Sequence, residues 1–362
     1  MKKSLLYLNS AIAVVLLISM ITLSCCHYPV VENDEKGITV SPVEKQRGVH
    51  VFGRMDSTTF EDLNRIHADY ITLVPYAGQN GHDSPEIRYF RSEDPAQNKE
   101  RNDRWVRQIE ACHEAGFKVF IKPHIWIRNA SSGKWRSDIY YDNEEEWNTW
   151  SKNYRSFILH YAELSEQANV EMFCIGTELT RLSKGKPEFW RALIKDVKSV
   201  YTGKLTYAGN WYKEYESISF WDELDYIGIQ AYFPLTNKNN PETEELKQAW
   251  ERKSSDFAAI SKRFNKPILF TEIGYKSTTD GASKPWEWVD YYNNGASFEQ
   301  SDETQANAYQ SVFETIWDEP WFAGIHLWQW RGDGRNRRGR THLDFTPQNK
   351  PAEQIIAEGF KR

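Results

Sequence analysis

The sequence has few cysteines: four in 362 residues, with Cys25 and Cys26 adjacent and Cys112 and Cys174 far apart. No Cys-x-x-Cys pair occurs, which argues against a structural zinc site. Cys112 falls in a helical pattern and Cys174 in an apolar strand, so we expect both to be buried free thiols. No two histidines stand at the H-x-x-x-H spacing either, and we expect no metal and no cofactor.

Nucleotide-binding motifs and an excess of positive charge are also absent. Neither G-x-G-x-x-G nor the phosphate-binding G-x-x-x-x-G-K-[ST] is present. The chain carries 45 Lys and Arg against 51 Asp and Glu, a net charge of −6, which argues against a nucleic-acid partner. What the chain has in excess is aromatic side chains, 14% of the residues and including 15 Trp. Such an excess predicts a wet, aromatic-lined groove.

The N-terminus has the pattern of a lipoprotein signal. Lys2 and Lys3 precede an apolar stretch that ends before Ser24 and Cys25. A small residue before a cysteine resembles a bacterial lipobox, so we expect Cys25 to carry lipid and to anchor the chain to a membrane of the bacterial cell envelope, on its periplasmic or surface face. Lipidation at Cys26 and an uncleaved membrane anchor are the alternatives. The predicted division is a signal peptide over 1–24, a polar tether over 25–46 and a folded domain over 47–362.

The rest of the chain alternates short apolar runs with amphipathic helical runs. This pattern predicts an α/β fold, a single (β/α)₈ TIM barrel, because eight strands alternate with helices. An open doubly wound sheet is the alternative, and it lacks a nucleotide-binding motif. The predicted strands cover 48–54, 70–76, 118–127, 170–179, 204–211, 226–233, 267–275 and 322–330.

Two of the predicted strands end in a glutamate, where barrel enzymes build their sites. Because side chains alternate between the two faces of a strand, Glu178 shares a face with Cys174 and Gly176, and Glu272 shares one with Phe270. Buried carboxylates are costly unless they have a task. A pair of carboxylates is what glycoside hydrolysis requires, one to protonate the leaving oxygen and one to attack the anomeric carbon or activate water. Two structural ion pairs are the alternative.

The same alternation brings further side chains to this end of the barrel. Sugars offer apolar faces and hydroxyl edges, which aromatic rings and amide or imidazole groups bind. Tyr232 is placed to hydrogen-bond Glu272. Packing in the barrel is the alternative for each tryptophan, and a core role is the alternative for His124. The predicted substrate-binding residues are His124, Trp126, Asn210, Tyr232, Trp328 and Trp330.

Several segments, in this order along the chain, resemble glycoside hydrolase family 113. They are CIGTEL, YAGNW, YIGIQAYFPL, ILFTEIGY, GIHLWQW and DFTPQNKPAE, between residues 174 and 353. The resemblance implies a retaining (β/α)₈ glycosidase with endo-β-1,4-mannanase activity. It also implies that Glu178 is the acid/base and Glu272 the nucleophile. Many members of the wider clan have Asn before the acid/base; this chain has Thr177 there, and we expect Asn210 to contact the sugar 2-hydroxyl instead.

The predicted partner is therefore an oligo- or polysaccharide. A sugar-binding barrel without turnover and a structural surface lipoprotein are the competing interpretations. Residues 331–340 hold five arginines, which predict either a solvated loop or a clamp for an acidic glycan. The sequence leaves open whether the glycan is mannan, glucan, xylan or a decorated chain, and whether cleavage is internal or terminal.

Overall fold

The computed structural model describes residues 43–89, 94–130, 133–289, 297–332 and 342–362. The predicted signal peptide, Cys25 and the tether up to residue 42 lie outside the described residues, as does most of the arginine-rich segment. Within the described part, no helix is long and apolar enough to cross a membrane.

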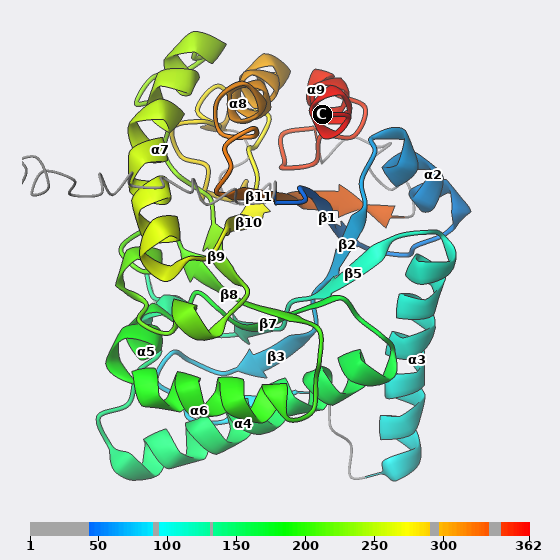
Figure 1. The fold of residues 1–362 in the computed structure, drawn as a ribbon, viewed down its shortest axis with the longest axis vertical. Coiled ribbons are helices and arrows are strands. Elements are labelled where there is room, and N and C mark those ends of the chain that lie inside the picture. The colour runs from blue at the N-terminus through cyan, green and yellow to red at the C-terminus, as the bar shows by residue number, and fades with distance from the viewer. Residues whose placement is uncertain (1–42, 90–93, 131–132, 290–296, 333–341) are drawn as a thin grey trace, which may run out of the picture. The chain divides into compact units, whose positions relative to one another are not determined.

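Eight parallel strands close into a barrel, as the sequence predicts (Figure 1). The first strand pairs with both the last and the second, so the sheet of the barrel has no free edge. The barrel strands, in their order around it, are β1 (Gln46–Phe52), β11 (Phe322–Arg331), β10 (Ile268–Ile273), β9 (Tyr226–Gln230), β8 (Lys204–Asn210), β7 (Met172–Thr177), β5 (Lys118–Ile121) and β2 (Tyr70–Leu73).

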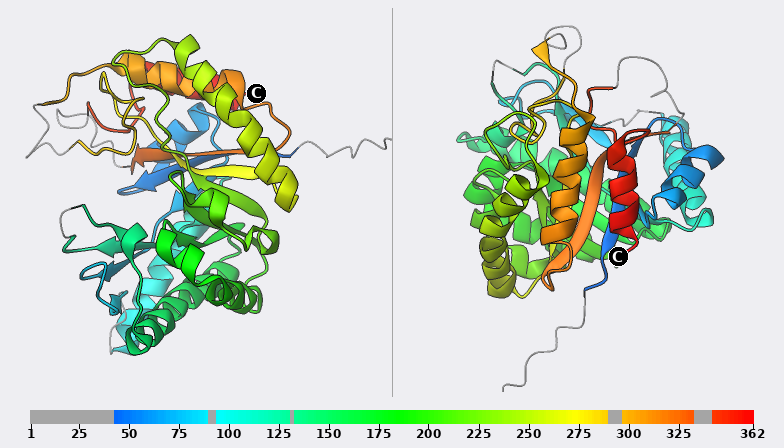
Figure 2. Two further views of the ribbon diagram at one scale, coloured as in Figure 1. Left: turned by 90° about the vertical axis from the view of Figure 1, so that its left-hand side faces the viewer. Right: turned by 90° about the horizontal axis from the view of Figure 1, so that it is seen from above.

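Helices cover the outside of the barrel, and α7, α8 and α9 lie side by side (Figure 2). Several begin at a side chain that accepts a backbone N–H of the first turn, such as Asp56 before α2 and Asn143 before α4. The α-helices are α2 (Ser57–Arg65), α3 (Pro95–Glu114), α4 (Glu144–Gln167), α5 (Thr180–Gly185), α6 (Pro187–Lys198), α7 (Thr243–Phe264), α8 (Asp302–Thr315) and α9 (Pro351–Phe360). Short 3₁₀ turns, η1 (Arg136–Asp138), η2 (Tyr215–Ser217) and η3 (Trp221–Glu223), lie in the loops.

Two of the predicted strands are each broken in two by a proline. Pro75 follows β2 and Pro123 follows β5, and proline has no N–H to donate to a neighbouring strand. The residues beyond the breaks leave the barrel and form a separate sheet from β3 (Tyr76–Gln79), β4 (Ile87–Arg88) and β6 (His124–Ile127). The chain beyond the third barrel strand thus carries His124 and Trp126 in this small sheet.

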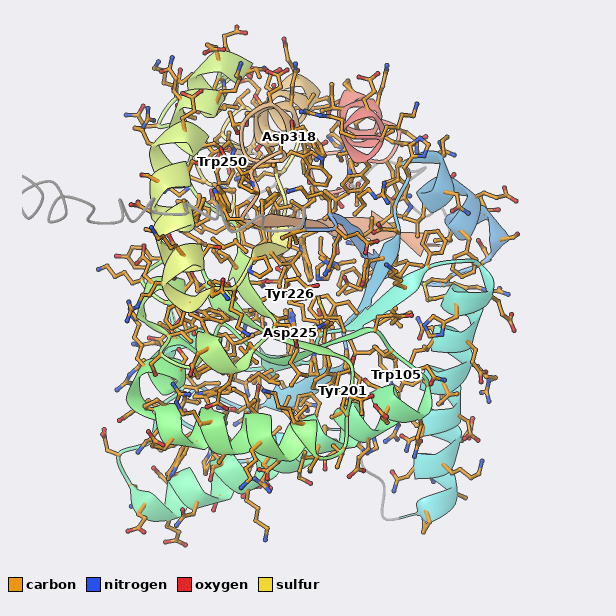
Figure 3. All side chains as sticks on the ribbon, in the orientation of Figure 1. Trp105, Tyr201, Asp225, Tyr226, Trp250 and Asp318 are labelled. Atoms are coloured by element: carbon orange, nitrogen blue, oxygen red, sulfur yellow. The ribbon has the colours of Figure 1, made fainter. Side chains whose placement is uncertain are left out.

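The apolar core has two layers. The inside of the barrel is filled by a small cluster, and the space between barrel and helices by a large one that includes Trp150 and Trp190. Trp105 and Trp250, labelled in Figure 3, lie on α3 and α7 in this outer layer. Cys112 and Cys174 are buried and free, as predicted. The inner cluster consists of Tyr70, Phe120, Met172, Cys174, Ala208, Leu269 and Ala323.

Candidate active site

Glu178 follows the last residue of β7 and is 7% exposed. Its backbone has a left-handed φ of 52°, and its N–H donates to the Ala208 carbonyl on β8 at 2.9 Å. The predicted alternation fails just before it, because the register with β8 shifts between Cys174 and Thr177. A side chain on Gly176 would meet the outer layer, not the barrel interior. Glu178 therefore lies at the predicted end of the barrel, but its direction is set by a bulge in β7 and by its own left-handed backbone, not by regular alternation.

The Glu178 carboxylate is held at both oxygens. Arg136, from η1, donates from Nη2 and Nε to Oε2 at 2.9 and 3.1 Å. Asn210, at the end of β8, donates from Nδ2 to Oε1 at 3.0 Å. Arg136 is itself 7% exposed, so this ion pair is shielded from water. Strong ionic hydrogen bonds on one oxygen and a neutral one on the other fix the orientation of the carboxylate.

Glu272, on β10, is 3% exposed and points into the barrel mouth. The prediction that Glu272 shares a strand face with Phe270 is wrong. Phe270 packs in the outer layer, whereas Leu269 and Thr271 face the barrel interior. The register with β9 shifts between Phe270 and Glu272, which rotates the end of the strand. Tyr232 donates from Oη to Oε2 of Glu272 at 2.8 Å, the contact predicted from the sequence.

The other oxygen of Glu272 faces a cation. Lys122, fully buried in the barrel, donates from Nζ to Oε1 of Glu272 and also to Oε1 of Gln230 at 2.9 Å. Burial lowers the pKa of Lys122, and the charge of Glu272 opposes that shift. Burial and Glu272 raise the pKa of Tyr232 well above its usual range, so Tyr232 keeps its proton and remains a donor.

Two histidines lie against Oε1 of Glu272. His124 Nε2 is 3.5 Å from it and His50 Nε2 is 3.9 Å from it. Burial and the nearby charge of Lys122 hold the pKa of both rings well below the usual range, so both are neutral. Arg136 Nη1 lies 3.3 Å from Nδ1 of His124, so His124 connects the Arg136–Glu178 pair to Glu272.

The neutral state fixes which ring nitrogen carries each proton. Arg136 can only donate, so Nδ1 of His124 accepts and Nε2–H is left as a donor. His50 Nδ1 lies 3.0 Å from the Leu327 carbonyl, so Nδ1 donates and Nε2 is left as an acceptor. Neither Nε2 atom has a hydrogen-bond partner, and neither does Nε1 of Trp328. The mouth therefore holds an unpaired acceptor and two unpaired donors.

The two predicted tryptophans of β11 lie on opposite faces. Trp328 is at the mouth, with its ring 5.0 Å from that of His50 and in contact with Tyr232 and Phe345. The alternation breaks after it, since Leu327 pairs with Val49 but Trp330 pairs with Val51.

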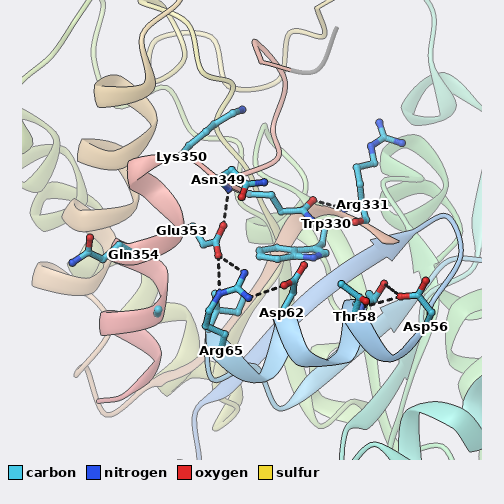
Figure 4. A pocket seen from close by; sticks show the side chains of 14 residues that line it. Asp56, Thr58, Asp62, Arg65, Trp330, Arg331, Asn349, Lys350, Glu353 and Gln354 are labelled. Atoms are coloured by element: carbon cyan, nitrogen blue, oxygen red, sulfur yellow. Dashed lines mark hydrogen bonds and ion pairs between the residues drawn. The ribbon is translucent and has the colours of Figure 1, made fainter. Parts of the chain in front are cut away.

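Trp330 is buried in the outer layer instead, which corrects the prediction that it shares the face of the glutamates. It lines a pocket of about 880 Å³ between α2 and α9, beside Asp62, Arg65 and Glu353 (Figure 4). A bulge in β11 therefore turns Trp330 away from the barrel interior.

Exposed aromatic rings extend from this mouth in two directions. Trp126 is 50% exposed and its ring packs edge-on against those of Tyr76 and Trp135. On another side, Trp288 is 55% exposed and lies edge-on to Trp328 at 6.0 Å. A further pair, Trp211 and Trp286, stacks at 5.2 Å directly after Asn210 in the chain. The exposed fraction of Trp286 is 45%.

The model of glycoside hydrolase family 113 matches residues 46–350 of the chain. The chain belongs to glycoside hydrolase family 113. Two solved structures described as GH113 β-1,4-mannanase, one of them a complex, are 25% identical to it, with a TM-score of 0.72 over 88% of this chain and 99% of theirs. The GH113 β-mannanase of Alicyclobacillus acidocaldarius is 24% identical, with a TM-score of 0.70 over 88% of this chain and 98% of that one. No curated protein matches the chain.

As a family 113 member the chain is a glycoside hydrolase. Its site also contains three residues, Lys122, His50 and Arg136, that the sequence did not predict. Lys122 could have been noticed, because it is a lone charge in an apolar strand. His50 is a lone histidine in the first strand, and its Nε2 faces Glu272. Arg136 lies in a polar loop without periodicity, so nothing marked it. Among the described residues of this family 113 chain, no group of His, Cys, Asp or Glu side chains could hold a metal ion.

Proposed function

We propose that this family 113 chain is a retaining glycoside hydrolase that cleaves β-linked glycans of the β-1,4-mannan type. The observation that carries the proposal is a pair of buried carboxylates, Glu178 and Glu272, at one mouth of the barrel, each with a cation and a neutral donor. The β-1,4-mannanases among the solved structures similar to this chain support the choice of glycan.

Glu272 is the nucleophile in this proposal. Its ionised carboxylate attacks the anomeric carbon while the bond to the leaving oxygen breaks, and Glu178 gives that oxygen its proton. In the second step Glu178 takes a proton from water, the water oxygen attacks the anomeric carbon, and the bond to Glu272 breaks. Tyr232 keeps its proton and so orients Oε2 of Glu272 throughout.

Arg136 and Asn210 support the acid/base. Arg136 places a positive charge beside the carboxylate that Glu178 becomes when it gives up its proton. Asn210 holds the second oxygen at 3.0 Å. The predicted contact of Asn210 with a sugar hydroxyl remains part of the proposal, because its side chain lies at the mouth beside Glu178.

The unpaired polar atoms around Glu272 suit a sugar. A hydroxyl group both donates and accepts, and the mouth offers an acceptor on His50 and donors on His124 and Trp328. Each of these atoms is buried, so leaving it without a partner is costly until a ligand supplies one. The exposed rings of Trp126, Trp286 and Trp288 provide apolar surfaces for further sugar units along a chain.

The proposal is tested by incubating the purified protein with β-1,4-mannan, β-1,4-glucan, xylan and an activated aryl β-mannoside. We expect release from mannan, with the product first appearing as the β-anomer, which identifies retention. A 2-fluoro sugar with a good leaving group should label Glu272, as seen by peptide mass spectrometry. Glu272→Ala should abolish release, and Glu178→Ala should regain activity on the aryl substrate when azide is added.

Two outcomes contradict the proposal in different ways. Binding of glycans without release from any of them favours the second candidate, a glycan-binding barrel without turnover. Release of the α-anomer first excludes the double-displacement mechanism. The size of the products separates internal from terminal cleavage.

We also propose that the chain is anchored in the bacterial cell envelope by lipid on Cys25 after removal of residues 1–24. The support is the sequence pattern of Lys2, Lys3 and the apolar stretch before Ser24. Incorporation of labelled palmitate into the wild type and into Cys26→Ala, but not into Cys25→Ala, is the expected result. Labelling of Cys25→Ala assigns the lipid to Cys26 instead.

A further inference from the structure

A further buried carboxylate, in addition to Glu178 and Glu272, lies in the loop between β8 and η2. Glu214 is fully buried and accepts four hydrogen bonds. Ser183 Oγ and Tyr207 Oη donate to Oε1, each at 2.7 Å. The Asn210 N–H and Thr180 Oγ1 donate to Oε2, at 2.7 and 3.0 Å. No Lys, Arg or His in the described part of the chain forms an ion pair with it.

Two of these donors, Thr180 and Ser183, belong to the segment that directly follows Glu178. Thr180 begins α5, two residues after the acid/base, and bonds Glu214 directly. Leu179, between them, donates its N–H to Tyr207 Oη at 2.8 Å, and Tyr207 in turn donates to Glu214. The left-handed backbone of Glu178 is thus followed by two residues that are tied to one carboxylate.

The third tie runs through Asn210. Its backbone N–H bonds Glu214, while its side chain donates to Oε1 of Glu178 and accepts from the Tyr212 N–H at 2.8 Å. Glu214 therefore joins the turn after the acid/base to the residue that holds the acid/base by its side chain. These two segments come from neighbouring strands, β7 and β8.

A carboxylate is an expensive choice for this place, because burial penalises its charge. Burial raises the pKa of Glu214 to about 7, even though its four hydrogen bonds act in the opposite direction. An amide side chain of the same size would avoid the charge, but it has one acceptor oxygen where four donors converge. The amide oxygen must face the Asn210 N–H, which cannot accept, so the amide nitrogen faces Ser183 and Tyr207. Tyr207 then has no acceptor for its own proton at Glu214.

We propose that Glu214 is a positioning residue for the acid/base, fixing both the turn after Glu178 and the Asn210 side chain so that Glu178 meets the leaving oxygen. The inference rests on the proposed function. It predicts that loss of Glu214 slows cleavage of the glycosidic bond when the leaving oxygen must be protonated. Cleavage should be little affected when the leaving group departs without a proton.

The test compares Glu214→Gln with wild type on two substrates, a β-1,4-mannooligosaccharide and an aryl β-mannoside with a dinitrophenol leaving group. We expect kcat/KM of Glu214→Gln to fall about 100-fold on the oligosaccharide, the usual cost of a misplaced catalytic group. On the aryl substrate we expect a loss of less than about 3-fold, because dinitrophenolate leaves without protonation. kcat/KM reports only the first step, so the later need for a base does not enter.

Glu171→Gln is the matched control. Glu171 precedes β7 at the opposite end of the barrel and accepts the Val119 N–H at 2.7 Å, so it anchors the backbone far from the site. We expect equal, small effects of this substitution on both substrates. Tyr207→Phe is the second variant, because it removes only the hydroxyl between Glu214 and the Leu179 N–H, and it should show the same leaving-group dependence.

The outcomes separate the two proposals. Equal losses on both substrates for Glu214→Gln and Tyr207→Phe, or no loss on the oligosaccharide, overturn the positioning role of Glu214 while leaving the proposed function intact. No hydrolysis of either substrate by the wild type overturns the proposed function, and the positioning role with it. If Glu214→Gln does not fold, Tyr207→Phe decides.

Discussion

Each carboxylate at the barrel mouth is held by one cation and one neutral donor. Glu178 has Arg136 and Asn210, and Glu272 has Lys122 and Tyr232. Burial penalises the charge of a carboxylate, and the cation beside each one offsets that cost. In each carboxylate the cation and the neutral donor bond different oxygens, so together they fix its orientation, because hydrogen bonds are directional.

The neutral donor on Glu178 gives a prediction for Asn210. We expect Asn210→Ala to lower kcat far more than it raises KM, because the substitution frees one oxygen of Glu178, the proposed acid/base, without removing an apolar surface for the sugar. Steady-state kinetics on a β-1,4-mannooligosaccharide measure this. Asn129→Ala, which removes an exposed pair with Asn80, is the matched control. An unchanged kcat in Asn210→Ala would contradict the role assigned to that hydrogen bond.

A second prediction concerns the pH dependence of stability. The pKa of Glu214 is raised from 4.5 to about 7 in the folded protein, so the folded chain binds a proton in this window that the unfolded chain does not. Wild-type stability contributed by Glu214 is therefore full below pH 4.5 and is lost as the pH rises through 7. Three of the four donors are hydroxyls, which can reverse and accept from the protonated acid.

The measurement is urea unfolding of wild type and Glu214→Gln at pH 5 and pH 7.5. Between these pH values the wild type should lose about 2 kcal/mol of free energy of unfolding relative to the variant, because the window covers most of the shift in the Glu214 pKa. A difference that stays constant across this window would show that Glu214 titrates near its ordinary pKa.

At the scale of the element, the eight barrel strands could be predicted from the sequence, but their bulges and the small sheet of β3, β4 and β6 could not. Apolar runs and helical periodicity are local, so they identify all eight barrel strands. A bulge is fixed by the register with the neighbouring strand, and it inverts every face beyond it. The assignments of Gly176, Phe270 and Trp330 to the interior are wrong for this reason. Glu178 and Glu272 reach the mouth because the bulges lie just before them.

The bulge in β11 predicts opposite phenotypes for its two tryptophans. Trp330→Phe should lower the free energy of unfolding by about 1–3 kcal/mol and leave kcat/KM unchanged, because Trp330 packs in the outer layer. Trp328→Ala should lower kcat/KM on a mannooligosaccharide by about tenfold or more, since it removes a ring and an N–H at the mouth. Urea unfolding and steady-state kinetics of both variants test this. A lower kcat/KM in Trp330→Phe would contradict the conclusion that Trp330 has no part in catalysis.

At the scale of the whole molecule, the aromatic excess divides between two tasks. Most of the tryptophans, such as Trp150, Trp190 and Trp250, pack between helices and barrel. A smaller set at the mouth is exposed and faces the proposed glycan. Composition alone could not distinguish buried from exposed tryptophans, because both contribute equally to the aromatic content. The role of Arg136 could not be predicted from the sequence either, because its contact with Glu178 forms only when the folded barrel brings the loop of η1 next to β7.

Closure of the barrel depends on its first strand. β1 begins at Gln46 and pairs with β11 on one side and β2 on the other, with Val49 opposite both Leu327 and Ile71. Before it, Lys45 Nζ donates to the carbonyl of Glu319 at 2.8 Å. A chain that begins at residue 43 keeps all of these contacts, whereas one that begins at residue 53 loses a whole strand and leaves two open edges.

We therefore expect the chain 43–362 to be soluble and to unfold cooperatively, because it contains all eight barrel strands and the pairings of β1 with β2 and β11. The chain 53–362 should aggregate or fail to unfold cooperatively, because the open edges of β2 and β11 can pair with other chains. Circular dichroism melting and size-exclusion chromatography distinguish these results. Failure of 43–362 to unfold cooperatively would show that the eight strands and their helices do not suffice for the fold, and a cooperative transition for 53–362 would show that the barrel tolerates the loss of β1.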